Sequence, residues 1–141
     1  MTDEIAPSWR LRIDRTLDPM IQRWIEEVMA PHRFRYDPES MQFAADGMDR
    51  IELDSMISMV IDLCRSSLGG IIEDGDLEDY MDTLASEGTL KRGTEPLPED
   101  AFDTACIAAI VYVKILRILG SEASVEIAVE DGIPYIGLVA E

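Results

Sequence analysis

The sequence predicts an α+β domain in which antiparallel β-hairpins pack against helices, in the order α-ββ-α-α-α-ββ. Three observations predict this class. Apolar residues recur at helical spacing in several segments. Asp-Gly dipeptides separate short apolar segments near residues 46 and 131. Of the 141 residues, 47% are hydrophobic, which is ordinary for a globular protein and argues against disorder. We expect about four helices and four or five strands.

The first helix is predicted to begin with Asp18 as its N-cap and Pro19 in its first turn, and to end at Pro31. Residues 1–15 are then an N-terminal arm, partly flexible, and residues 16–141 form the single domain. The basic residues at positions 10–15 are interpreted as an ion-pairing strip or a docking arm, because the protein as a whole is too acidic to favour a nucleic-acid site.

The first hairpin is predicted to join residues 41–45 to residues 50–53. A three-residue loop is favoured over a two-residue loop because it pairs Phe43 with Ile51 and keeps the apolar side chains on one face. A short strand at residues 32–36 can precede this hairpin.

The second hairpin is predicted around Asp131-Gly132, where a two-residue turn places the apolar side chains of both strands on one face. The predicted pairs are Val129 with Pro134, Ile127 with Ile136, and Val125 with Leu138. Proline cannot donate a hydrogen bond to a neighbouring strand. We therefore expect the strand of Pro134 to lie at a sheet edge or to turn that position outward.

Three helices are predicted between the hairpins. The first covers residues 56–68, with Asp54 or Ser55 as its N-cap, and the second covers residues 76–87. The third, residues 100–119, is apolar nearly all round and is expected to be the central buried helix. A loop at residues 91–99 precedes it.

Charge is the feature of this sequence that bears most directly on function. The formal net charge is −17, from 29 acidic and 12 basic residues. A charge of this size repels nucleic acid and anionic membranes and favours a basic partner protein. Residues 66–90 contain seven acidic residues and no basic one. The predicted partner-binding residues are the acidic side chains of this segment: Glu73, Asp74, Asp76, Glu78, Asp79 and Asp82.

The sequence predicts no catalytic residue, cofactor or metal site. Metal-ligand, phosphate-loop and nucleophile motifs are absent, and the acidic turn around Gly75 does not fit the spacing of a calcium loop. Two widely separated cysteines favour buried, reduced thiols and a cytoplasmic setting. The longest apolar run is interrupted by Lys114 and Arg117, so no membrane span is expected.

These observations favour a non-enzymatic, acidic protein-binding module of the adaptor, inhibitor or chaperone type, engaging a basic or amphipathic partner. In size, acidity and opening order of elements the chain resembles small secretion chaperones, although its helical middle and β-strand ending depart from them. The alternative is a phage-type inhibitor that mimics nucleic acid and binds a DNA- or RNA-handling enzyme. The unpaired hairpin edges are also compatible with a homodimer.

A third interpretation rests on the string Leu53-Asp54-Ser55-Met56. This string is similar to the Asp-Ser-Leu/Met element that opens the second helix of acyl and peptidyl carrier proteins. The resemblance implies that Ser55 carries phosphopantetheine. Carrier proteins are all-helical, however, whereas residues 41–53 are predicted here as a hairpin, and Asp-Ser is also an ordinary helix N-cap.

Overall fold

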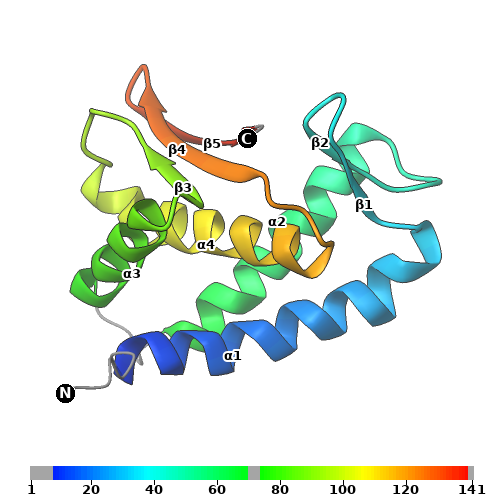
Figure 1. Ribbon diagram of the computed structural model, residues 1–141, viewed down its shortest axis with the longest axis horizontal. Helices are drawn as coiled ribbons and strands as arrows, with labels where there is room; N and C mark the ends of the chain where they lie inside the picture. The colour runs from blue at the N-terminus through cyan, green and yellow to red at the C-terminus, as the bar shows by residue number, and fades with distance from the viewer. Residues whose placement is uncertain (1–7, 70–73, 140–141) are drawn as a thin grey trace.

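The computed structural model describes residues 8–69 and 74–139, which form four α-helices and five β-strands in the predicted class and order (Figure 1). The elements are α1 (Ser8–Trp24), β1 (Arg35–Asp37), β2 (Gln42–Ala44), α2 (Arg50–Leu68), α3 (Asp74–Ser86), β3 (Leu90–Arg92), α4 (Phe102–Ile118), β4 (Ser124–Glu130) and β5 (Ile133–Val139). A π-helical segment (Ile25–Met29) and a 3₁₀ turn (Ala30–His32) continue α1, and another 3₁₀ turn (Glu99–Ala101) precedes α4. Among the described residues, no helix has the length and apolar character needed to cross a membrane.

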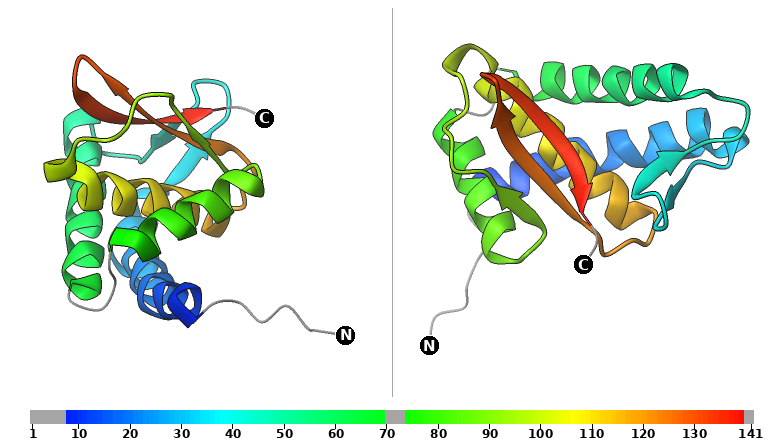
Figure 2. Two further views of the ribbon diagram at one scale, coloured as in Figure 1. Left: turned by 90° about the vertical axis from the view of Figure 1, so that its left-hand side faces the viewer. Right: turned by 90° about the horizontal axis from the view of Figure 1, so that it is seen from above.

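The centre of the molecule is α4, as its nearly continuous apolar sequence predicts. In Figure 1, α4 lies between the sheet that contains β4 and β5, above it, and α1, below it. Figure 2 shows α2 along one side of this stack and α3 along another. Ala109, Ile110 and Ile115 are completely buried, and ten residues of this helix belong to the core. Burial on all sides explains why the helix carries so few polar residues.

The main sheet has the strand order β3-β4-β5. The predicted second hairpin is confirmed, because Val129 pairs with Pro134 and Ile127 with Ile136 across antiparallel β4 and β5. Pro134 lies on the edge strand, where its missing N–H costs no internal hydrogen bond. The turn residue Asp131 has a φ of 53°, as a two-residue hairpin turn requires.

The predicted loop at residues 91–99 is wrong at its start, because Leu90–Arg92 forms β3, which pairs in parallel with β4. The chain crosses from β3 to β4 through α4, so the two strands are far apart in sequence. A three-residue strand has no local periodicity of its own. Its existence depends on a partner strand that begins at Ser124.

The first helix begins at Ser8 rather than at Asp18, so residues 8–15 are helical and do not form an arm, and Pro19 lies inside the helix. A proline within a helix lacks one N–H and costs about 3 kcal/mol. Ile13, Leu17 and Ile21 recur every four residues and are completely buried. Burying three such side chains contributes roughly 1.5–3 kcal/mol each, which outweighs the proline.

The predicted first hairpin is also corrected. Phe43 pairs with Tyr36 of β1, not with Ile51, because the short strand expected at residues 32–36 is its partner. Residues 50–53 form the first turn of α2 instead of a strand. The cause is Asp49, whose carboxylate accepts a hydrogen bond of 2.8 Å from the backbone N–H of Glu52 and caps the helix.

Candidate functional site

The acidic segment predicted to bind a partner forms the amphipathic helix α3. Its inner face is apolar and buried, and consists of Leu77, Tyr80, Met81 and Leu84. The carboxylates of Glu78, Asp79 and Asp82 lie on the outer face, where all three residues are exposed. The spacing of three and four residues between apolar positions therefore places the acidic residues together toward solvent.

Two of the predicted acidic residues are engaged within the protein. Asp76 forms an ion pair of 3.9 Å with Arg12 of α1, and Asp82 forms an ion pair with Arg92 of β3. Glu78 and Asp79 form no ion pair with another described residue. These two carboxylates, unlike Asp76 and Asp82, are not occupied in holding α3 to its neighbours.

The remaining two predicted residues are Asp74 and Glu73. Asp74 is the first residue of α3. Glu73 lies outside the described residues. The structure therefore places four of the six predicted side chains, and two of these face outward without an ion-pair partner among the described residues.

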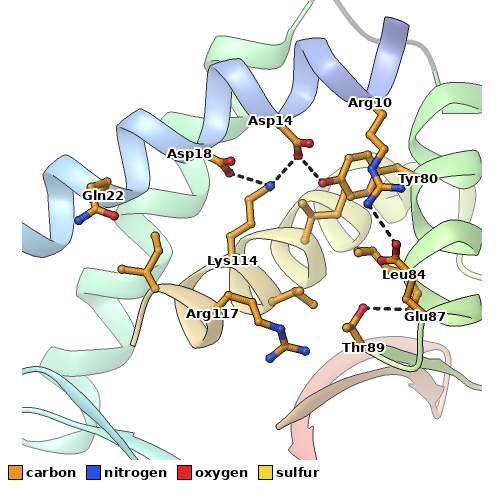
Figure 3. A pocket seen from close by; sticks show the side chains of 13 residues that line it. Arg10, Asp14, Asp18, Gln22, Tyr80, Leu84, Glu87, Thr89, Lys114 and Arg117 are labelled. Carbon is orange, nitrogen blue, oxygen red and sulfur yellow. Dashed lines mark hydrogen bonds and ion pairs between the residues drawn. The ribbon is translucent and has the colours of Figure 1, made fainter. Parts of the chain in front are cut away.

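A polar cluster that the sequence did not predict lies between α1, α3 and α4 (Figure 3). The ammonium group of Lys114 is 2.7 Å from a carboxylate oxygen of Asp14 and 2.7 Å from one of Asp18. The hydroxyl of Tyr80 donates a short hydrogen bond to the same oxygen of Asp14. One lysine and one tyrosine thus join three helices through two carboxylates.

The protonation states in this cluster are set by competing effects. Burial alone would lower the pKa of Lys114, but the neighbouring Tyr80, the hydrogen bonds to Asp14 and Asp18 and the charge of Asp18 outweigh it and raise that pKa. Burial also raises the pKa of Tyr80 to about 12, opposed by Lys114 and reinforced by Asp14. Both groups therefore keep their protons at neutral pH.

The cluster borders an open cavity of about 440 Å³. Arg10 of α1 reaches Glu87 at 3.2 Å on its rim, and its guanidinium lies 5.7 Å from the centre of the Tyr80 ring. Arg117 donates hydrogen bonds to the backbone carbonyls of Ser121 and Ala123. Because its charged groups already have partners within the protein, this cavity is best understood as a polar junction between elements.

The signal for this junction is visible in the sequence only in part. Asp14 and Asp18 are four residues apart, so a helix over both places them on one face. A helix that begins at Asp18, as predicted, does not contain Asp14, so the prediction missed that the two carboxylates share a face. Lys114 lies in the second half of α4, and nothing local in the sequence indicates that it faces α1.

The serine of the carrier-like string is exposed, but it lies in the second turn of α2 rather than at its start. Neither Asp54 nor Ser55 is the N-cap, which is Asp49. Asp54 instead forms an i,i+4 ion pair of 3.6 Å with Arg50. The position of Ser55 along its helix thus departs from that of the serine that the resemblance implies.

Two further hollows lie along the edge strand β5. One, of about 250 Å³, lies between β5, the β1–β2 hairpin and the first turns of α2; the other, of about 300 Å³, lies between β5 and the first turns of α4. Tyr112 and Ile136 line both, so the two hollows are neighbours along β5. The pair of hollows is called here the β5 groove, and residues of α4 line the floor of both.

Comparisons of this chain with protein-family models, with curated proteins and with solved structures return no match. Within residues 8–69 and 74–139, no group of three or more His, Cys, Asp and Glu side chains is placed to hold a metal ion. The surface chemistry of the chain itself is therefore the basis for inferring its function.

Proposed function

We propose that this chain is a non-enzymatic, acidic protein-binding module of the adaptor, inhibitor or chaperone type. Its partner is a basic or amphipathic protein. The observation that carries the proposal is the outer face of α3, where Glu78 and Asp79 are exposed and form no ion pair with another described residue. A cationic surface that meets this face would neutralise charges that the protein leaves uncompensated.

The distribution of ion pairs supports the same proposal. Among the described residues, ion pairs join seven basic side chains to seven carboxylates: Arg10, Arg12, Arg33, Arg35, Arg50, Arg92 and Lys114 with Asp14, Asp18, Asp46, Asp54, Asp76, Asp82 and Glu87. The chain has 29 acidic and only 12 basic residues. Internal pairing thus consumes most of the bases, and the surplus of carboxylates is available to a partner.

We also expect the protein to act in the cytoplasm. Cys64 and Cys106 are buried and form no disulfide, which suits a reducing compartment. The sequence gives no reason to expect direct binding to nucleic acid, since a phosphate backbone would be repelled.

The test is affinity capture from native lysate, with the protein as bait at low and moderate salt. The variant E78Q/D79N removes two charges from α3 without touching an ion pair. The variant E52Q/D62N is the matched control, because it removes two exposed carboxylates of α2 that form no ion pair with another described residue. A partner lost with the first variant and kept with the second supports the proposal. Capture that is unchanged by both variants would show that the acidity serves solubility alone.

The same experiment addresses the alternatives. If the captured protein handles DNA or RNA, and nucleic acid competes with the bait, the acidic face acts as a nucleic-acid mimic. The carrier interpretation is tested separately by intact mass after co-expression with a phosphopantetheinyl transferase. An unmodified mass would exclude Ser55 as an attachment site.

A further inference from the structure

The open edge of β5 presents backbone hydrogen-bonding groups to solvent. The N–H of Val125 donates to the carbonyl of Thr89, and the carbonyl of Ile127 accepts from the N–H of Gly93. These two residues of β4 therefore direct their polar groups toward β3. In an antiparallel pair, the residues opposite them on β5 direct their own groups away from β4.

Those opposite residues are Leu138, which faces Val125, and Ile136, which faces Ile127. Among the described residues, no backbone group outside the sheet forms a hydrogen bond with either of them. Pro134, two positions earlier, offers a carbonyl but no N–H. The edge thus carries two N–H groups and three carbonyls within a span of about 13 Å, at roughly 3.3 Å per residue.

The β5 groove lies directly beside this edge. In the right-hand view of Figure 2, α4 passes beneath β5 and continues under the space between β5 and α2. Ala105, Ala108 and Tyr112 of α4 line its floor on the side of the 300 Å³ hollow, and Leu53 and Ile57 of α2 line the 250 Å³ hollow. A strand added to β5 would point alternate side chains into these hollows, and the 300 Å³ hollow, whose lining is mostly apolar, favours apolar ones.

The surroundings of the groove are acidic. Residues 93–113 and 118–141 contain no Lys, Arg or His, and they supply Glu99, Asp100 and Asp103 near one end of the groove and Glu130 and Asp131 at the hairpin turn. Arg50 lines the opposite end but forms an ion pair with Asp54. The flanks of an added strand would therefore meet an uncompensated negative field.

This charge decides between two occupants. A second copy of the chain would bring another net charge of −17 and the same acidic hairpin turn to the interface. A partner segment flanked by Lys or Arg would instead be attracted. We propose that the β5 edge binds an extended segment of a partner protein as an added strand, with apolar residues at alternate positions and basic residues at its ends. This inference rests on the proposed function and names the partner chemistry that it uses.

The probe for the test is a synthetic peptide of alternating valine and threonine with two lysines at each end. Amide hydrogen exchange followed by NMR measures its effect on the wild-type protein. We expect exchange at Ile136 and Leu138 to slow by about tenfold or more, the factor that one ordinary hydrogen bond supports. Exchange at Tyr135 and Gly137 should change little, because their positions already pair with β4. A peptide with glutamates in place of the lysines should give no protection.

A pair of variants isolates the backbone contribution. L138P removes the outward N–H and the side chain, whereas L138A removes only the side chain. We expect L138P to weaken binding of the lysine peptide at least about tenfold more than L138A does. Circular dichroism and thermal unfolding establish that both variants are folded. Equal affinities of the two variants would overturn the proposal.

Two other results would also overturn the proposal. One is no protection of the Ile136 and Leu138 amides at millimolar peptide. The other is protection without peptide that increases with protein concentration, which would identify a second copy of the chain as the occupant. Failure of this inference differs from failure of the proposed function. If a natural partner depends on Glu78 and Asp79 but binds L138P normally, the β5 groove is not its binding site and the proposed function stands. If the peptide protects the amides but no partner is captured through α3, the proposed function of the acidic face is wrong.

Discussion

Lys114 and Asp14 are one hundred residues apart in the sequence, yet the Nζ atom of Lys114 lies 2.7 Å from a carboxylate oxygen of Asp14. The same ammonium group also contacts Asp18 at 2.7 Å. This contact ties α1 to the central helix α4 at a point where the lysine side chain is only 12% exposed. Without the lysine, the carboxylates of Asp14 and Asp18 would repel each other next to the apolar side chains of α4.

We therefore predict that Lys114→Met destabilises the protein by about 2 kcal/mol. The figure is below the 3–5 kcal/mol typical of a broken buried pair, because Asp14 and Asp18 are partly exposed and water solvates them. Urea unfolding measures the change. Lys91→Met is the matched control, since Lys91 is exposed and its loss should stay within about 0.5 kcal/mol. Equal effects of the two substitutions would contradict a stabilising role for the cluster.

The buried titratable groups predict a loss of stability at alkaline pH. Burial raises the pKa of Cys64 from 9.0 to about 11 and that of Tyr80 from 10.0 to about 12, and the pKa of Lys114 is raised as well. Each group binds its proton more tightly in the folded state than in the unfolded state. Their contribution is complete below about pH 9 and falls as the pH rises through the folded values.

Urea unfolding at pH 7, 9, 10 and 11 checks this expectation. The free energy of unfolding should decline above about pH 9, with the thiol contributing first. Cys64→Ala should flatten the decline between pH 9 and 11, whatever its effect at pH 7. A wild-type profile that stays flat over this range would show that these groups titrate alike in both states.

The N-cap of α2 gives a prediction that separates the two candidate caps. Asp49→Ala removes the hydrogen bond to the backbone N–H of Glu52 and should cost about 1 kcal/mol. Ser55→Ala changes an exposed residue in the second turn and should stay within about 0.5 kcal/mol. Chemical denaturation of both variants distinguishes them. The reverse order would restore the assignment of the cap to residues 54–55.

Two glycine substitutions should act in opposite directions. A Cβ atom at Gly93 would lie 2.9 Å from the Cβ of Ala128, so Gly93→Ala forces β3 away from β4 and should cost about 1–3 kcal/mol. A Cβ atom at Gly75 meets nothing within 4 Å, and this residue lies in the first turn of α3. Gly75→Ala should therefore stabilise the protein by about 0.5 kcal/mol. Thermal unfolding compares the pair, and a harmless Gly93→Ala would argue against the close pairing of β3 and β4.

The second hairpin shows how much local sequence can predict. Its turn residues and the alternation of Val125, Ile127 and Val129 sufficed for the register, because only one register puts the apolar side chains on one face. The burial of α4 was equally accessible from its composition. The acidic face of α3 followed from helical spacing alone.

The predictions from sequence are wrong where a local signal competes with burial elsewhere in the chain. Asp18-Pro19 is a good helix start in isolation, but Ile13 and Leu17 are buried against the core and extend the helix through it. Asp46-Gly47 is a good hairpin turn, but Asp49 caps a helix directly after it. In both places the local preference is worth only a few kcal/mol, and tertiary contacts outweigh it.

The sequence by itself determined the α+β class, the order of elements, the central buried helix and the excess of negative charge, since each depends on composition or short-range periodicity. Only the tertiary structure decided that β3 pairs in parallel with β4, that Lys114 joins Asp14 and Asp18, and that β5 borders a groove. Each of these features brings together residues that are distant in the chain. Their free energy comes from burial and hydrogen bonding across that distance, and no local pattern in the sequence records it.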